Sequence, residues 1–168
     1  MRDIFRYIGN FVWNILLVYI CYSICRVIFI LDNWDSFNYL TASDFIRLCR
    51  GGLLFDTAAI AYTNVLYVLL VFLPLHLKER NGYRRFVKWT FVVVNLLMLA
   101  MNLMDSGYFP FSNQRTTTSI FAQFSNEDNL VGILCIEAIR SWYLIVAFVC
   151  FAFVLWKFYR VPEYKSQN

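Results

Sequence analysis

The sequence predicts an all-α membrane protein with about four transmembrane helices, short interfacial amphipathic helices and both termini in the cytoplasm. Hydrophobic residues make up 60% of the 168 residues and charged residues only 15%, against about 25% charged in typical globular domains. Several apolar runs reach the roughly 20 residues that a helix needs to cross a bilayer. Because a helix satisfies its backbone polar groups internally, runs of this length predict helices rather than strands.

Four apolar runs are predicted to be the spans of a single transmembrane domain covering residues 1–168. These runs are residues 8–31, 53–75, 86–104 and 141–158. The fourth starts earlier, near Leu130, if the apolar residues before Ser141 belong to it. Asn81-Gly82 predicts a tight turn, so we expect the second and third spans to form an antiparallel hairpin.

The distribution of Lys and Arg predicts the side of the membrane on which each connection lies, because cytoplasmic connections are enriched in these residues. If the four spans alternate, most of the 15 basic residues fall on one side: Arg2, Arg6, Lys78, Arg80, Arg84, Arg85, Lys88, Lys157, Arg160 and Lys165. We therefore expect both termini and the connection between spans two and three to be cytoplasmic. The two longer connections are then outside.

Short amphipathic helices are expected in both outer connections. Thr41 followed by Asp44 is typical of a helix start, and the apolar residues that follow share one face. Such a helix lies flat at the membrane interface, and Gly51-Gly52 is expected to end it. The second connection has apolar residues at helical spacing at Ile120, Phe121 and Phe124.

Arg26 and Asp56 are charged residues at matching depths in the first two spans, close to their outer ends. Charges within a membrane are costly and are usually paired or functional. We expect an ion pair between the two helices. The alternative is that Arg26 extends to the lipid headgroups and Asp56 faces a wet crevice. Three amides also lie within spans and are expected to form interhelical hydrogen bonds rather than a transport path, namely Asn64, Asn95 and Asn102.

The most polar outer segment is Ser112–Ser119, in which Arg115 is surrounded by hydroxyl and amide side chains. An arginine fork with neighbouring donors suits a phosphate, which at this depth is a lipid headgroup. Arg115 and Thr116 are therefore the first candidates for a lipid-phosphate contact, followed by Arg140 and Arg47. The segment is also explained by a capped helix start, and the two interpretations are compatible.

The sequence offers no recognisable catalytic machinery. His76 is the lone histidine and lies on the predicted cytoplasmic side, so no nucleophile–His–carboxylate set is expected. The five cysteines have neither disulfide-framework nor metal-ligand spacing. We expect no catalytic residue, metal site or cofactor in this chain. The net charge of +4 is too dispersed for a nucleic-acid partner, whereas membrane lipids are expected partners.

Two segments resemble a known family. They are residues 51–62 (GGLLFDTAAIAY) and 102–111 (NLMDSGYFPF), the latter followed by the Arg-Thr-Thr at 115–117. These segments resemble the membrane domain of lipoteichoic-acid-synthase-like proteins of the sulfatase family, in the alkaline phosphatase superfamily, and are most similar to its Bacteroides-type branch. The resemblance covers nearly all of the chain.

The resemblance implies a multi-pass protein of the bacterial cytoplasmic membrane. Members of the family begin with five spans, and an extracytoplasmic domain follows with a threonine nucleophile and a divalent cation, usually manganese. They transfer phosphoglycerol or phosphoethanolamine headgroups. The chain ends at Asn168, so we expect the fifth span and the catalytic domain, which is its implied partner, to be absent from it.

On this basis we expect a domain that anchors a headgroup transferase and presents its lipid substrate on the outer face of the cytoplasmic membrane. Whether the chain belongs to an enzyme is left open by its own residues. The alternatives are a free-standing small polytopic scaffold and a transporter subunit. In the scaffold, the pair of Arg26 and Asp56 and the buried amides would only hold helices together.

Overall fold

The structure is a computed structural model that describes residues 2–72, 80–112 and 141–162. These residues form helices and no strands. The elements are α1 (Arg2–Asp32), the short 3-10 helix η1 (Trp34–Ser36), α2 (Ala42–Thr63), α3 (Val65–Phe72), α4 (Asn81–Ser112) and α7 (Trp142–Phe158).

Two helices are long and apolar enough to cross a membrane, Ile4–Asp32 and Asn81–Gly107. A third candidate is the pair α2 and α3, which qualifies if the two helices form one span with a bend of 52°. The helix α7 is apolar but has only 17 residues. The described part of the chain is therefore a helical, membrane-associated protein with two or three candidate spans.

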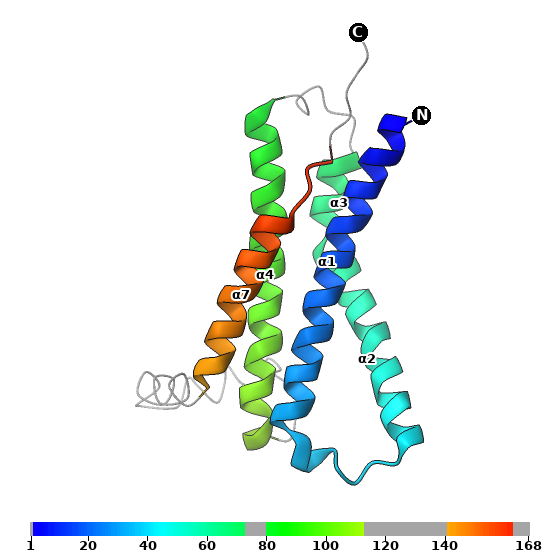
Figure 1. The fold of residues 1–168 in the computed structure, drawn as a ribbon, viewed down its shortest axis with the longest axis vertical. Coiled ribbons are helices and arrows are strands. Elements are labelled where there is room, and N and C mark those ends of the chain that lie inside the picture. Colours follow the sequence, from blue (N-terminus) through cyan, green and yellow to red (C-terminus); the bar gives the residue numbers. More distant parts are fainter. Residues whose placement is uncertain (1, 73–79, 113–140, 163–168) are drawn as a thin grey trace.

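The helices run alternately up and down in one bundle (Figure 1). At one end, which we call the near end, α1 begins, α3 ends, α4 begins and α7 ends. Tyr83 donates a hydrogen bond there to the carbonyl of Leu70 at 2.7 Å. At the opposite end, the far end, α1 and α4 end and α2 begins. Asn33 there donates to the carbonyl of Ser106 at 3.3 Å.

Hydrogen bonds between α1 and the chain after α7 close the near end. The Asn14 amide is fully buried, and it donates to the Tyr67 hydroxyl at 2.9 Å and to the Arg160 carbonyl at 2.7 Å. Its oxygen accepts from the Arg160 backbone N–H at 2.9 Å. Asn10 donates in the same way to the carbonyl of Val161 at 2.9 Å. A buried amide with all of these partners stabilises the bundle, because lipid offers no replacement for them.

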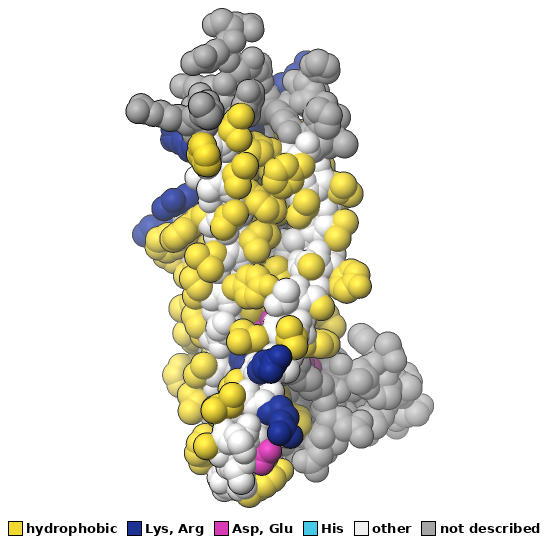
Figure 2. All heavy atoms as spheres, turned by 90° about the vertical axis from the view of Figure 1, so that its right-hand side faces the viewer, with side chains coloured by type: hydrophobic (Ala, Val, Ile, Leu, Met, Phe, Trp, Pro, Cys, Tyr) yellow, Lys and Arg dark blue, Asp and Glu magenta, His cyan; other side chains and the backbone are white. Residues whose placement is uncertain are grey.

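The core is a narrow apolar seam, and much of the apolar surface faces outward. Val18, Phe91 and Leu155 are completely buried, whereas Phe5 and Tyr62 are 75% and 79% exposed. Figure 2 shows hydrophobic side chains over the middle of one face, with Lys and Arg toward its ends. Soluble monomers rarely expose so continuous an apolar surface, and a bilayer would solvate it directly.

The start of α2 confirms one local prediction and corrects another. The Thr41 hydroxyl caps α2 by accepting from the Asp44 N–H at 3.3 Å. However, α2 does not end at Gly51-Gly52 but continues to Thr63. Glycine within a helix costs only about 1 kcal/mol relative to alanine, and the apolar turns on either side of the two glycines continue the helix through them. The predicted interfacial helix and the start of the predicted second span are thus one element.

The structure corrects one further helix boundary and shows a bend inside the second predicted span. Asn81-Gly82 is not a turn between helices but the first turn of α4, a position where residues of this kind are tolerated. The predicted span 53–75 is not one straight helix, because the chain bends by 52° at the break between α2 and α3. Asn64 lies at this break as the C-cap of α2.

A reciprocal amide pair joins the break to α4. The Asn64 amide nitrogen donates to the Asn95 side-chain oxygen at 3.0 Å, and Asn95 donates back to the Asn64 oxygen at 2.9 Å. The two nitrogens also donate to the carbonyls of Ile60 and Phe91. The expected interhelical hydrogen bonds are thus confirmed for these two residues. Asn102 instead donates to the Met98 carbonyl of its own helix at 3.0 Å.

Replacing Asn95 by Leu is expected to destabilise the bundle, because Asn64 then loses its interhelical partner. Interhelical hydrogen bonds contribute about 0.6 and at most about 1.7 kcal/mol each, so we expect a loss of about 1–2 kcal/mol. Thermal unfolding in detergent, followed by circular dichroism, measures it. Asn102→Leu is the control and should cost less. Changing Asn64 and Asn95 together to Leu should recover part of the loss; a double variant less stable than Asn95→Leu would contradict this account.

Candidate functional site

A large cavity lies at the far end, where α2 diverges from α1 (Figure 1). We call it the α1–α2 groove. Its volume is about 740 Å³, within the range of small-molecule and cofactor sites. It is lined by Arg26, Phe29, Ile30, Phe37, Leu40, Asp44, Arg47, Leu48, Cys49, Gly51, Gly52, Phe55 and Phe109.

Most of the groove wall is apolar, and three aromatic rings from different elements form part of it. Phe29 on α1 packs edge-on against Phe109 on α4, with ring centroids 5.1 Å apart. Phe37, which follows η1, stacks on Phe109 at 6.1 Å. Aromatic contacts of this kind add about 0.5–1.5 kcal/mol beyond the burial of their area. They join the connection between α1 and α2 to the end of α4.

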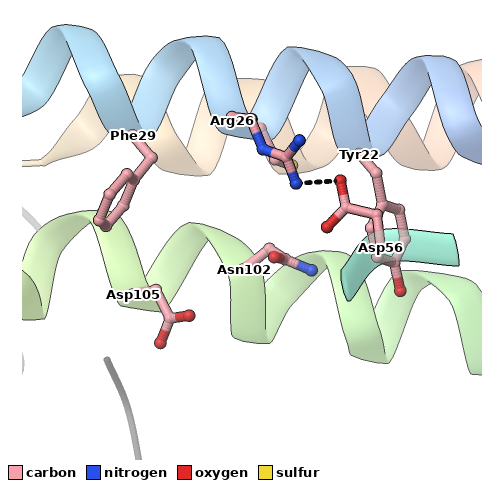
Figure 3. A pocket seen from close by; sticks show the side chains of 7 residues that line it. Tyr22, Arg26, Phe29, Asp56, Asn102 and Asp105 are labelled. Atoms are coloured by element: carbon pink, nitrogen blue, oxygen red, sulfur yellow. Dashed lines mark hydrogen bonds and ion pairs between the residues drawn. The ribbon is translucent and has the colours of Figure 1, made fainter. Parts of the chain in front are cut away.

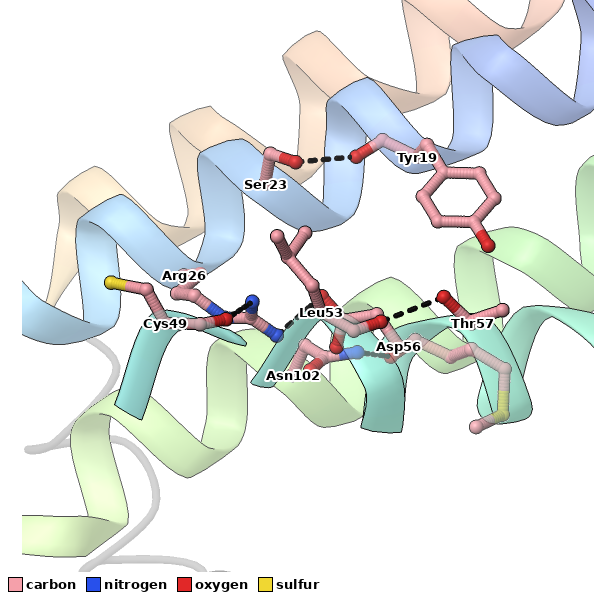
Figure 4. A network of polar contacts seen from close by, with 9 residues as sticks. Tyr19, Ser23, Arg26, Cys49, Leu53, Asp56, Thr57 and Asn102 are labelled. Carbon is pink, nitrogen blue, oxygen red and sulfur yellow. Dashed lines mark hydrogen bonds and ion pairs between the residues drawn. The ribbon is translucent and has the colours of Figure 1, made fainter. Parts of the chain in front are cut away.

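The structure brings Arg26 and Asp56 together where the groove narrows. A terminal guanidinium nitrogen of Arg26 lies 2.5 Å from a carboxylate oxygen of Asp56. The other terminal nitrogen donates to the Cys49 carbonyl at 3.3 Å. The two side chains are only 14% and 7% exposed. Figure 4 shows the guanidinium between α1 and α2, and both of its partners among the described residues are on α2.

Gly52 makes the close approach of this guanidinium possible. A Cβ atom at position 52 would lie 2.7 Å from both terminal nitrogens of Arg26, closer than non-bonded atoms are found. A Cβ at the neighbouring Gly51 would meet no atom within 4 Å. The glycine in α2 is therefore part of the ion-pair site.

A second, much smaller cavity lies beside the ion pair, on the side of α4 (Figure 3). Its volume of about 10 Å³ has room for about one water. It is lined by Tyr22, Cys25, Arg26, Phe29, Asp56, Asn102 and Asp105. The Tyr22 ring lies beside Asp56 (Figure 3), and its hydroxyl is buried. The buried ion pair therefore has the polar side chains of Asn102 and Asp105 close by.

Arg47 lies at the rim of the groove and differs from Arg26 in its environment. It is exposed and forms no ion pair within the described residues. The nearby Asp44 carboxylate accepts a hydrogen bond from the Thr41 hydroxyl at 2.5 Å. The charge of Arg47 is therefore available to a ligand, whereas the charge of Arg26 is neutralised by Asp56. An apolar trough with an available cation at its edge suits an amphiphilic anion.

The other predicted lipid contacts are Arg115, Thr116 and Arg140, and all three lie outside the described residues. Within those residues, no group of three or more His, Cys, Asp or Glu could hold a metal ion. Cys21, Cys25, Cys49 and Cys150 are free thiols.

Sequence reasoning missed Gly52 and Tyr22 as parts of the site. The sequence predicts only a helix stop at Gly51-Gly52, yet a glycine one turn before a buried acid is also typical of a close approach by a partner side chain. Tyr22 is four residues from Arg26 and therefore on the same helix face. That spacing was the available signal.

Gly52→Ala is expected to displace the Arg26 guanidinium from Asp56 and to destabilise the protein by up to about 3 kcal/mol, since a broken buried ion pair leaves an uncompensated charge. Gly51→Ala is the matched control, and a gain of about 0.5–1 kcal/mol is expected from its higher helix propensity. Thermal unfolding of both variants in the same detergent measures the difference. Equal stability of the two variants would show that the contact at position 52 does not matter.

No family model, curated protein or solved structure matches this chain.

Proposed function

We propose that the chain is a membrane-embedded domain that binds a phospholipid in the α1–α2 groove and presents its headgroup on the outer face of the membrane. The acyl chain occupies the apolar trough, and the phosphate lies beside Arg47. The observation that supports this proposal is the groove itself, which has a volume of about 740 Å³, apolar walls and an available cation at the rim.

The proposed topology has four spans, α1, α2 with α3, α4 and α7, and both termini in the cytoplasm. The near end of the bundle is basic, with Arg6, Arg80, Arg84, Arg85, Lys88, Lys157 and Arg160 among its residues. The far end contains acids at positions 32, 35, 44 and 105. Because basic connections stay in the cytoplasm, this asymmetry supports an outward-facing far end. The groove then opens at the outer leaflet.

We further propose that the domain serves a sulfatase-family transferase of phosphoglycerol or phosphoethanolamine headgroups, with the catalytic domain as its partner. Both segments that resemble the lipoteichoic-acid-synthase-like family contribute to the groove, 51–62 through Gly51, Gly52 and Phe55, and 102–111 through Phe109. Arg115 follows shortly after Ser112, the last residue of α4. In this proposal Arg115, Thr116 and Arg140 join Arg47 in binding the phosphate.

The bend at Asn64 favours a second candidate, a transporter subunit, because broken helices often mark substrate sites near the middle of the membrane. However, the amide nitrogens of Asn64 and Asn95 are already donated to each other and to helix carbonyls. A scaffold is the third candidate, and these same contacts support it. The groove favours lipid binding over both, because neither alternative requires an apolar trough with a cation at its rim.

Arg47→Gln is expected to weaken binding of an anionic phospholipid roughly fivefold, since one basic residue near a lipid surface contributes about 1 kcal/mol. Arg50→Gln is the matched control, because Arg50 is exposed on the same helix but does not line the groove. The measurement is photo-crosslinking in vesicles with phosphatidylglycerol that has a diazirine in its acyl chain, with the labelled peptides identified by mass spectrometry.

A second pair of variants tests the trough. Leu48→Trp should narrow the groove and reduce labelling of its lining residues, whereas Ile46→Trp, on the exposed side of α2, should leave the labelling unchanged. Equal labelling in all four variants, or labels spread evenly over the lipid-facing surface, would rule out the groove as the binding site.

The transferase proposal has a separate test in the native cell. Removing the region that encodes this chain should eliminate phosphoglycerol- or phosphoethanolamine-modified acceptors, measured by mass spectrometry of the cell-envelope lipids. Re-expression with Arg115→Ala should leave membrane insertion intact but fail to restore those products. An unchanged lipid profile after removal would refute the transferase role, even if the groove binds lipid.

A further inference from the structure

A second groove lies at the near end of the bundle, between the start of α4 and the end of α7, and we call it the α4–α7 groove. Its volume is about 460 Å³, and it is lined by Arg84, Arg85, Lys88, Trp89, Trp156 and Val161. It shares no lining residue with the α1–α2 groove. Nearly all of the surface that it exposes belongs to apolar atoms, although half of its lining residues are cations.

The spacing of the residues on α4 explains this combination. Positions 85 and 89 are four apart, and so are positions 84 and 88, so each pair shares a helix face one turn apart. Arg84 and Arg85 are therefore on the turn nearer the end of the helix, while Lys88 and Trp89 are one turn deeper. The Trp89 and Trp156 rings meet edge-on at 4.9 Å and form a wall that joins the two helices. The Lys88 ammonium lies over the Trp156 ring at 4.0 Å.

The two helices that form this groove supply no carboxylate near it. The described residues of α4 before Asp105, and all of α7, contain no Asp or Glu. The described contacts of the Lys88 ammonium are with the rings of Trp156 and Tyr159 rather than with a carboxylate. Arg85 is exposed. Ring faces stabilise a cation without neutralising it, so the site still attracts an anion.

We propose that the α4–α7 groove binds an acidic phospholipid, with its phosphate between Arg85 and Lys88 and one acyl chain against Trp89 and Trp156. A guanidinium fork and an ammonium are complementary to a phosphodiester, and basic pockets between transmembrane helices recognise acidic headgroups. The indole wall supplies the apolar contact that a free anion would not use. Under the topology proposed above, this lipid belongs to the cytoplasmic leaflet.

This lipid differs in role from the one in the α1–α2 groove. It bridges α4 and α7, and it is remote from the ion pair and from the far end, where headgroup chemistry would take place. The α4–α7 groove is thus a site for a lipid that stabilises the bundle, and this role does not depend on the transferase proposal. The two sites are separately testable, because they share no residue.

The experiment measures quenching of tryptophan fluorescence by brominated lipids in nanodiscs. A reporter variant retains Trp89 and Trp156 and has Phe in place of Trp13, Trp34 and Trp142. Phosphatidylglycerol with brominated acyl chains, titrated into phosphatidylcholine, should quench the reporter at a far lower mole fraction than brominated phosphatidylcholine does. The pair Arg85→Gln and Lys88→Gln should raise that mole fraction roughly thirtyfold, at about 1 kcal/mol for each cation.

The matched control neutralises Arg6 and Lys157 to Gln in the same reporter. This change removes the same charge from exposed residues of α1 and α7 that do not line the groove, and it should leave the preference for phosphatidylglycerol nearly intact. An equal loss in both double variants would show a general surface-charge effect and overturn the proposal. Equal quenching by the two lipids in the unmodified reporter would also overturn it. Arg47→Gln should change nothing here, which separates this result from the α1–α2 groove.

Circular dichroism shows whether the groove variant folds. If it does not fold, a second measurement tests the proposal. The unmodified chain is purified from micelles containing equal amounts of the two lipids and examined by native mass spectrometry. Selective retention of phosphatidylglycerol is expected, and Arg85→Lys with Lys88→Arg should preserve it. Retention in proportion to the mixture would contradict the site.

Discussion

The contact between Arg26 and Asp56 is the constraint on which the arrangement of the far end depends. The two residues are on α1 and α2, and they meet at 2.5 Å where the helices begin to separate. A buried charge without a partner costs several kcal/mol, so the pair fixes how far α2 departs from α1 at this depth. Gly52 supports the same contact by leaving space for the guanidinium. Arg26 thus lines the α1–α2 groove with its charge paired, while Arg47 provides the charge that is available to a ligand.

The two ends of the bundle differ because their polar side chains are used differently. At the near end, the Asn14 side chain forms hydrogen bonds both with Tyr67 on α3 and with the backbone of Arg160 after α7. These bonds connect three elements. At the far end, Asn33 bonds to α4, and the Ser106 hydroxyl donates to Asp32, while the described hydrogen bonds between α1 and α2 come from Arg26 alone. Within the described residues, few hydrogen bonds therefore join α2 to its neighbours at the far end. A space between α1 and α2 follows from this difference.

The sequence was sufficient to locate helices but not their breaks. The apolar runs 8–31, 86–104 and 141–158 correspond to α1, α4 and α7. A long apolar run predicts a helix from its residue types alone, without knowledge of the neighbouring helices. The meeting of Arg26 with Asp56 followed from their matching depths and from the cost of burying a charge. The continuation of α2 through Gly51-Gly52, and the break at Asn64, depended on side chains from other helices. A local rule places a helix stop at Gly51-Gly52 because it ignores the side chains that pack there. The same kind of rule places Asn64 within a helix because it ignores Asn95 on the neighbouring helix. The groove arises from these tertiary contacts, so no local pattern predicted it.

The bend at Asn64 connects these observations. A straight helix from Ala42 to Phe72 that packed closely against α1 at the near end would also lie against α1 at the far end. The 52° bend instead lets α3 remain against α1, where Tyr7 donates to the Val71 carbonyl, while α2 diverges. Such a break would expose backbone groups to lipid, which is costly. The Asn64 side chain offsets part of this cost by donating to the Ile60 carbonyl and pairing with Asn95. The amide pair in the middle of the bundle and the ion pair nearer its far end therefore act together: the first permits α2 to diverge, and the second limits the distance.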